Sequence, residues 1–283
     1  MDRALLQEEY SNLLEFLRSA GDTSGASPVT PSLEGYLLLA RHLASYELGE
    51  EYAGRDVLEV GCFLGYGSAL LSGLGHDVTA IDLDRGALEA ASKRAAARFV
   101  CADATEMPFE DRSFDSVIGL QVLEHLSEED ARRFIAECSR VLRCDGGLLV
   151  ATPNRRFRLM PGQKPWNPDH QRELDGVQVR DLLSPWFDEV TIKGSRAAGW
   201  IEDVERKRVG RSAFRAYIAI PAGKLAKAAA PALAGRCRKP QASPLSLSEF
   251  LAAAPDVGMS DFRLVDEVDM RSMEIIAIAR AGQ

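Results

Sequence analysis

The glycine-rich segment LEVGCFLGYG contains residues that are suited to binding a ligand. Gly61 and Gly65 frame a turn that contains Cys62 and Phe63, and glycine lets a backbone adopt positive φ and approach a ligand closely. Glu59 precedes the turn, near the end of a short apolar run that is typical of a buried strand. Ligands of open α/β sheets bind at the carboxyl ends of such strands. The segment therefore predicts a binding turn.

Two aspartates follow the next two predicted strands. Asp82 stands where an acid binds ribose hydroxyls in nucleotide sites. Asp103, just past the third strand, is a candidate to bind an adenine amino group. The alternative is that the glycine turn only packs a helix against a strand. Acids at successive strand ends make that alternative weaker.

A dinucleotide is the weaker ligand, because its turn requires the pattern G-x-G-x-x-G. Counting from Gly61 places Phe63 and Tyr66 at the second and third glycines, and counting from Gly65 places Leu70 at the third. Neither frame matches in full, so the sequence disfavours a nicotinamide cofactor.

Strands and helices alternate from residue 55 onward, which is typical of a parallel sheet with helices on both faces. Ser32 and Ser127 are placed to cap two of the helices. We expect the last strand to lie at or near the sheet edge. The predicted strands are 55–60, 77–81, 99–101, 115–120, 148–152, 188–193 and 273–279, and the predicted helices are 3–19, 33–46, one from about 65, 85–97, 128–142 and 177–186.

The expected fold is of the α/β class, with a Rossmann-like, seven-stranded, mostly parallel sheet and helices on both faces. We divide the chain into four parts. They are an N-terminal helical cover at 1–50, a ligand-binding core at 51–195, a basic helical insertion or cap at 196–246, and a C-terminal helix with the last core strand at 247–283.

Composition and charge exclude several classes of protein. The net charge of −8 and the pI near 5.2 argue against nucleic acid as a partner. No apolar run is long enough for a transmembrane helix, and MDRALLQEEY lacks a secretory signal pattern, so we expect a cytoplasmic protein. The cysteines form no C-x-x-C pair and the histidines are scattered, so we expect neither a metal site nor disulfides. The cysteines are Cys62, Cys101, Cys138, Cys144 and Cys237.

Four segments together resemble the successive motifs of class I S-adenosylmethionine-dependent methyltransferases. They are LEVGCFLGYGS, TAIDLD, CADATEMPFEDRSFDSVIGLQVLEHL and RVLRCDGGLLVATPN, within residues 55–155. The resemblance implies S-adenosylmethionine as cofactor and S-adenosylhomocysteine as product. The residues that it implies in cofactor binding are Glu59, Gly61, Cys62, Phe63, Gly65, Asp82, Leu83, Asp103, Ala104 and Gln121.

Within this resemblance the binding roles differ. Gly61 to Gly65 would line the methionine end, Asp82 would hold the ribose, and Gln121 would lie beside the methionine portion. Family members usually carry glycine where this chain has Phe63. Its ring either narrows the pocket or packs against a neighbouring helix or the N-terminal cover, and we expect packing.

Three further residues are candidates for catalysis. Methyl transfer from a sulfonium is an in-line displacement, and an alcohol acceptor benefits from a base such as His125, beyond the fourth strand. His125 could instead order its loop or hydrogen-bond the cofactor region. The segments ATPN and NPDHQREL resemble a bacterial subgroup associated with glycan and small-molecule modification, which implies that His170 and Glu173 face the acceptor. The alternative is a proline-rich loop pinned by Trp166 and a His–Glu hydrogen bond.

Residues 196–246 carry eleven Lys or Arg but only three Asp or Glu. A solvated helical cap is the ordinary interpretation, and contact with an anionic acceptor or a membrane surface is the sharper one. We expect methyl transfer to a hydroxyl of a small molecule or glycan that is anionic or lipid-linked. The alternatives are a catalytically silent binding protein with this fold and an N-methyltransferase.

Overall fold

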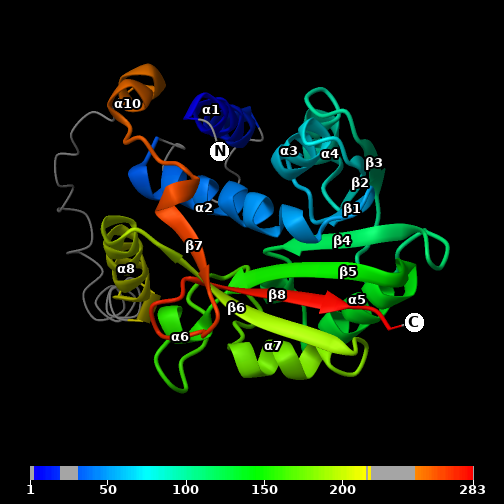
Figure 1. Cartoon of the computed structure of the whole chain (residues 1–283). Coiled ribbons are helices and arrows are strands. Elements are labelled where there is room, and N and C mark those ends of the chain that lie inside the picture. Colours follow the sequence, from blue (N-terminus) through cyan, green and yellow to red (C-terminus); the bar gives the residue numbers. More distant parts are fainter. Residues whose placement is uncertain (1–2, 20–30, 215, 218–245, 283) are drawn as a thin grey trace, which may run out of the picture.

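The computed structural model describes residues 3–19, 31–214, 216–217 and 246–282, and its centre is an eight-stranded sheet in the order β3-β2-β1-β4-β5-β8-β6-β7 (Figure 1). The strands are β1 Asp56–Val60, β2 Asp77–Asp82, β3 Arg98–Cys101, β4 Phe114–Leu120, β5 Leu142–Pro153, β6 Glu189–Ala197, β7 Phe262–Val265 and β8 Glu274–Arg280. The α-helices are α1 Arg3–Ser19, α2 Leu33–Gly49, α3 Tyr66–Gly73, α4 Arg85–Ala91, α5 Glu128–Val141, α6 Arg155–Arg158, α7 Gly176–Leu183, α8 Gly199–Phe214 and α10 Leu247–Ala253. Short 3-10 turns are η1 Glu50–Tyr52, η2 Leu123–His125 and η5 Met259–Asp261.

The sheet is mostly parallel, as predicted, but it has one strand more than the seven expected. Strands β1 to β5 pair in parallel, whereas β8 is antiparallel to both β5 and β6, and β7 is antiparallel to β6. The additional strand β7 has only four residues, which is too short for a clear two-residue periodicity. The last strand was expected at or near the sheet edge, but β8 lies third from the edge, between β5 and β6. Strand β8 is buried on both faces along almost its whole length, as an interior strand must be.

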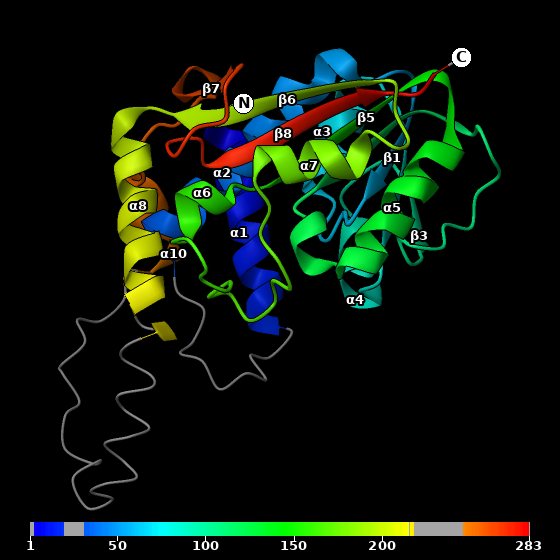
Figure 2. The ribbon, with the colours of Figure 1, turned by 90° about the horizontal axis from the view of Figure 1, so that it is seen from below.

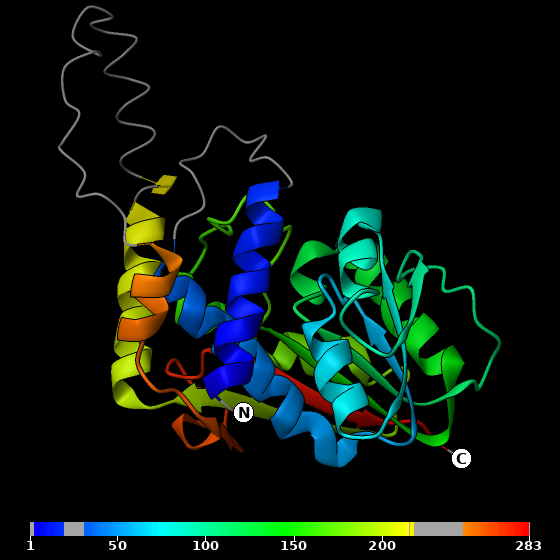
Figure 3. The same cartoon turned by 90° about the horizontal axis from the view of Figure 1, so that it is seen from above.

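Helices cover both faces of the sheet because successive strand residues point to opposite sides. Ile275 and Ala277 of β8 belong to a core under α5 and α7, and Ile276 and Ile278 belong to a core under α2, α3 and α4. Figure 2 shows α5 and α7 on one side of the sheet, and Figure 3 shows α2 and α3 on the other. The carboxyl ends of the parallel strands are thereby left for a ligand.

The N-terminal helices pack on α10 and α8 in a third apolar cluster. The ring of Tyr10 in α1 contacts those of Tyr36 in α2 and Phe250 in α10, with centroids 5.3 and 5.7 Å away. Ser32 caps α2, as predicted, by accepting a hydrogen bond from Gly35 N–H. These helices cover the sheet near its ligand side (Figure 3). The exact domain boundaries stay predictions.

The segment 196–246 contains the helix α8, and its residues 218–245, with Lys224, Lys227 and Cys237, lie outside the described residues. Three of the five described basic side chains in this segment, those of Arg196, Arg208 and Arg211, are paired with acids. Arg196 lies 3.1 Å from Glu202, and Arg211 pairs with Glu34 of α2. This pairing favours the interpretation as a helical cap.

No helix in the described part of the chain has the length and apolar character needed to cross a bilayer. A cytoplasmic location stays a prediction.

Candidate active site

A cavity of about 420 Å³ lies at the carboxyl ends of β1, β2 and β4, and we call it the glycine-turn cavity. Seven of the ten predicted cofactor residues line it, together with His125. Glu59, Cys62 and Gly65 do not. The lining residues are Val60, Gly61, Phe63, Tyr66, Ile81, Asp82, Leu83, Ala102, Asp103, Ala104, Leu120, Gln121, Val122, His125 and Leu126. The predicted residues are thus brought together from four separate loops.

Glycine is required at three places in the turn. Gly61 and Gly65 have φ of 73° and 70°, and Gly65 begins α3 in a left-handed conformation. A Cβ on Gly65 would lie 2.8 Å from the Cβ of Ala91, and one on Gly67 would lie 2.2 Å from the ring of Tyr46. Gly65 therefore shapes the turn through packing behind it.

Glu59 braces this turn from behind. Its carboxylate is fully buried and accepts hydrogen bonds from the Tyr46 hydroxyl, at 2.5 Å, and from the Ser68 hydroxyl. Burial raises the pKa of Glu59 to about 7. Cys62 is also buried, within the apolar core between the sheet and α2, α3 and α4. Neither side chain faces the cavity, because both point into the packed layer under the turn.

Phe63 combines a strained backbone with a packed ring. Its φ is 45°, a region that L-residues rarely adopt. Its ring meets Phe16 of α1 edge-to-face, with centroids 5.5 Å apart, so the expected packing against the N-terminal cover is present. Phe63 still contributes to the cavity wall.

Two aspartates provide the acidic groups of the cavity. Asp82 accepts hydrogen bonds from Phe63 N–H at 2.8 Å and from Asp84 N–H at 2.9 Å, one at each carboxylate oxygen. Asp103 accepts two from Thr105 at a single oxygen, Oδ1. Asp82 keeps a second lone pair on each carboxylate oxygen and Asp103 keeps those of Oδ2, so both residues can accept further bonds from hydroxyl or amino groups.

Gln121 joins the cavity to a buried ionic group that the sequence did not reveal. It has a φ of 59°, and its side-chain amide donates to Glu274 Oε1 at 2.8 Å. Glu274 is fully buried in β8 and also pairs with Arg41 of α2, with Nε and Oε1 3.0 Å apart. Two features of the sequence could have indicated this pair. Glu274 begins an apolar strand, and Arg41 lies among leucines and alanines in α2.

The three predicted catalytic residues lie together beside the cavity. The rings of His125 and His170 meet edge-to-face with centroids 5.0 Å apart. His170 Nδ1 lies 3.0 Å from Glu173, whose buried carboxylate also pairs with Arg158 at 2.9 Å. His125 alone of the three lines the cavity, and burial lowers its pKa. His170 and Glu173 therefore stand behind His125.

Glu124 completes this group, although the sequence gave no reason to select it. It is almost fully buried, and its Oε2 accepts a hydrogen bond of 3.0 Å from the Thr152 hydroxyl. Burial raises its pKa to about 8. One ligand atom each of Glu124, His125 and His170 lie within 4.8 Å of one another, so these described residues are close enough to share a metal ion.

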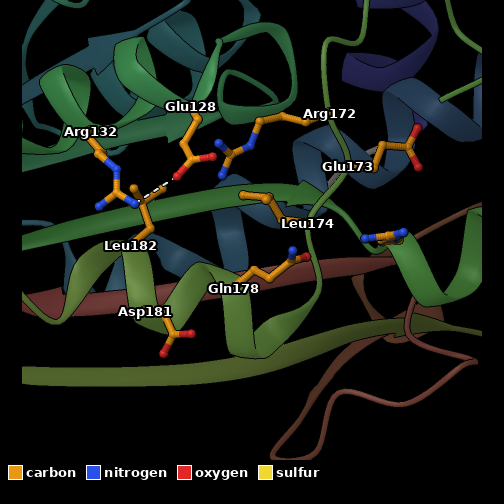
Figure 4. Close-up of a pocket in the computed structure, with 9 residues that line it drawn as sticks. Glu128, Arg132, Arg172, Glu173, Leu174, Gln178, Asp181 and Leu182 are labelled. Atoms are coloured by element: carbon orange, nitrogen blue, oxygen red, sulfur yellow. Dashed lines mark hydrogen bonds and ion pairs between the residues drawn. The ribbon is translucent and has the colours of Figure 1, made fainter. Parts of the chain in front are cut away.

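A second cavity of about 400 Å³ lies between α5 and α7 and shares no lining residue with the first (Figure 4). Arginines 132, 155 and 172 line it, but so do Glu128, Glu173 and Asp181. Glu128 lies between two of the arginines and pairs with Arg132 at 2.9 Å (Figure 4). Its charges balance, so this cavity does not by itself select an anion.

Comparisons with known proteins agree with this geometry. Residues 58–150 match a family described as a methyltransferase domain. A probable S-adenosylmethionine-dependent methyltransferase of Mycobacterium tuberculosis is 35% identical over 181 residues, which are 63% of this chain and 65% of that protein. A phthiotriol/phenolphthiotriol dimycocerosates methyltransferase of Mycobacterium ulcerans is 38% identical over 146 residues, which are 47% of this chain and 52% of that protein.

A solved structure extends the likeness to the whole fold. The S-adenosylmethionine-dependent methyltransferase of Thermotoga maritima, described as a possible histamine N-methyltransferase, superimposes with a TM-score of 0.55 and 12% identity. The match covers 96% of this chain and 99% of that one. This likeness shows the fold alone. The alignment with the Mycobacterium tuberculosis relative spans 65% of that protein's length.

Proposed function

We propose that this chain, which belongs to the class I S-adenosylmethionine-dependent methyltransferases, transfers a methyl group to a hydroxyl of a small molecule or glycan. The observation that carries the proposal is a single cavity lined by the glycine turn, by Asp82 and Asp103, and by His125. The family's cofactor supplies a methyl group on a positively charged sulfur, which makes that methyl group open to attack. The residues of the cavity must then align donor and acceptor.

The described residues suit each part of the cofactor. Asp82 can accept from ribose hydroxyls while it holds the Phe63 N–H, because each of its oxygens has a further lone pair. Asp103 can accept from the adenine amino group at Oδ2, since Thr105 occupies Oδ1. Apolar groups of Ile81, Leu83 and Leu126 offer a dry surface for the adenine ring.

His125 is the residue of this cavity that suits proton transfer. Partial desolvation lowers its pKa, so the ring is neutral near pH 7 and can accept a proton from an acceptor hydroxyl. Its Nδ1 lies 3.0 Å from the carbonyl oxygen of Asp169, which leaves Nε2 as the accepting nitrogen. His170, held by Glu173, packs edge-on against the same ring and would fix its orientation.

We also propose a chemical class for the acceptor. The Mycobacterium ulcerans relative is named for methylation of phthiotriol and phenolphthiotriol dimycocerosates, which supports an apolar or lipid-linked acceptor here. An anionic acceptor would depend on Arg206 and Lys207, because the other described basic residues of the segment 196–246 are paired with acids.

A second candidate function is binding without turnover. Phe63 favours it, because a bulky residue stands in the turn where family members carry glycine and forms part of the cavity wall. Such a protein would bind the cofactor and its product but methylate nothing.

Calorimetry and a turnover assay separate these functions. The full chain should bind S-adenosylhomocysteine and S-adenosylmethionine, and should transfer labelled methyl groups to some hydroxylated lipid or glycan in a panel. Binding without transfer to any acceptor would favour the silent protein. No binding of either molecule would refute both candidates.

A further inference from the structure

Two histidines beside the glycine-turn cavity each bring a ring nitrogen within 4.8 Å of the other and of a carboxylate oxygen. The Nδ1 atom of His125 lies 3.0 Å from the Asp169 carbonyl oxygen, and that of His170 lies 3.0 Å from Glu173. Both partners are acceptors, so in the neutral rings each Nδ1 carries the proton and each Nε2 has the lone pair. A neutral imidazole with its other nitrogen donating to a carbonyl or carboxylate is the usual state of a metal-binding histidine.

Glu124 brings a carboxylate to the same point. It is almost fully buried, and among the described residues a neutral group, the Thr152 hydroxyl, donates to its Oε2. Among the described residues no ion pair involves Glu124 within 4.0 Å, whereas the neighbouring Glu173 pairs with Arg158. Buried carboxylates are normally paired with a cation or bind a metal. Glu124 thus lacks the positive charge that a metal ion would supply.

We propose that Glu124, His125 and His170 bind a divalent transition-metal ion at the edge of the glycine-turn cavity. Their ligand atoms lie within 4.8 Å of one another, and metal bonds of about 2.0–2.2 Å need only a small inward movement of the side chains. Two imidazole nitrogens and one carboxylate oxygen suit Zn²⁺, Fe²⁺ or Mn²⁺ better than Ca²⁺. The proposal departs from the expectation, drawn from the sequence, that the chain has no metal site.

The residues around the three ligands are arranged to hold them. Arg158 fixes Glu173 at 2.9 Å, and Glu173 in turn fixes His170. The Gln171 side chain donates to the His125 carbonyl oxygen at 2.8 Å, and Gln171 N–H donates to that of Glu124 at 2.9 Å. The loop that carries His170 is thereby attached to the turn η2, although 44 residues separate His125 and Asp169. Such outer residues normally orient a metal's ligands.

The metal site would change the role of His125, and this part of the inference rests on the proposed function. A metal with three protein ligands keeps open coordination positions. Because His125 lines the cavity, these positions would face the cavity. There the acceptor hydroxyl would bind the ion and lose its proton to water. Its oxygen would then attack the methyl carbon as the carbon–sulfur bond breaks, and the sulfur would leave as a neutral thioether. A metal-bound His125 cannot also accept the proton.

The test titrates Zn²⁺ and Mn²⁺, each alone, into the full chain after treatment with a chelator. We expect saturable binding of one ion per chain, weakened at least tenfold by Glu124→Gln and by His170→Ala. Glu173→Gln, which leaves the three ligands in place, should weaken binding roughly tenfold through His170. His76→Gln is the matched control, because His76 bonds the Gly54 carbonyl oxygen far along the chain and should leave binding unchanged.

A spectroscopic measurement guards against misfolded variants. Co²⁺ bound by the wild type should give visible absorption bands that are lost in His170→Ala, while that variant still binds S-adenosylhomocysteine as the wild type does. Equal metal affinity in the wild type and in Glu124→Gln/His170→Ala would overturn the site. Methyl transfer that persists undiminished in chelator would overturn the metal's role and support His125 as base. Failure to bind S-adenosylhomocysteine would instead defeat the proposed function.

Discussion

Replacing Phe63 tests how the glycine turn tolerates a bulky residue at a positive φ. Its φ of 45° costs an L-residue about 1–2 kcal/mol, whereas glycine adopts this region freely. Phe63→Ala and Phe63→Gly both remove the ring, but only the glycine variant also relieves the strain. We therefore expect the glycine variant to be the more stable of the two, although alanine is the more stabilising residue where φ is negative.

The magnitude follows from the half-buried ring and its contact with Phe16. Removing a fully buried phenylalanine costs about 3–5 kcal/mol, so we expect Phe63→Ala to lose roughly 2 kcal/mol of unfolding free energy. Relief of strain, less the greater chain entropy of glycine, should leave Phe63→Gly roughly 0.5–1 kcal/mol more stable than Phe63→Ala. For a chain of this size, 1 kcal/mol moves the Tm by roughly 2–4 °C.

Urea denaturation measures the unfolding free energies of Phe63→Ala, Phe63→Gly, Phe16→Ala and Phe16→Ala/Phe63→Ala. These values give both the backbone strain at Phe63 and the energy of the contact between the two rings. The double-mutant cycle should give a coupling of about 0.5–1.5 kcal/mol for the two rings. A glycine variant less stable than the alanine variant would refute the argument from φ. Affinity for S-adenosylhomocysteine should stay unchanged in Phe63→Gly. Tighter binding with no loss of stability would mean that the ring intrudes on the methionine end of the cofactor.

Asp82→Ala should weaken S-adenosylhomocysteine binding tenfold or more in calorimetry, because charge-assisted hydrogen bonds contribute about 1.5–3 kcal/mol each. Asp84→Ala is the control, because Asp84 caps α4 and does not line the cavity. Equal affinity of the two variants for S-adenosylhomocysteine would mean that Asp82 only holds the loop in place. Glu59→Gln tests the buried carboxyl, whose pKa rises from 4.5 to about 7 on folding. The folded chain binds this proton more tightly, so Glu59 stabilises the fold below about pH 4.5 and that stability is lost as the pH rises to about 7. In urea denaturation, the stability of Glu59→Gln relative to the wild type should rise between about pH 5 and pH 8, and a flat difference would contradict the assignment.

The local parts of this fold were predictable because their signals are local. Ser32 and Ser127 cap their helices through residues three positions along the chain, and Gly65 begins α3 where the glycine pattern placed it. Asp82 and Asp103 line one cavity because parallel strands end at one edge of a sheet.

The parts that escaped prediction depend on contacts between distant segments. The position of β8 inside the sheet is set by its pairing with both β5 and β6, which no pattern within residues 273–279 specifies. Glu124 was indistinguishable from a surface acid in sequence, and its meeting with His170 depends on how the loop after β5 folds back onto η2. Helix α4 ends at Ala91 rather than Ala97, because the chain must turn there to enter β3.

A buried network of charged and polar side chains links the N-terminal cover to the cavity wall. Gln121 holds its positive φ with its amide bonded to Glu274, and Glu274 is neutralised by Arg41 of α2. Arg41 also pairs with Glu205 of α8 at 3.3 Å, so one buried network joins the cavity wall to two helices outside the sheet. Buried ionic networks are stable only when every member is satisfied, and removal of one partner leaves an uncompensated charge. Displacing α2 would therefore leave Glu274 unpaired behind Gln121, so the position of the cover and the shape of the cofactor cavity depend on each other.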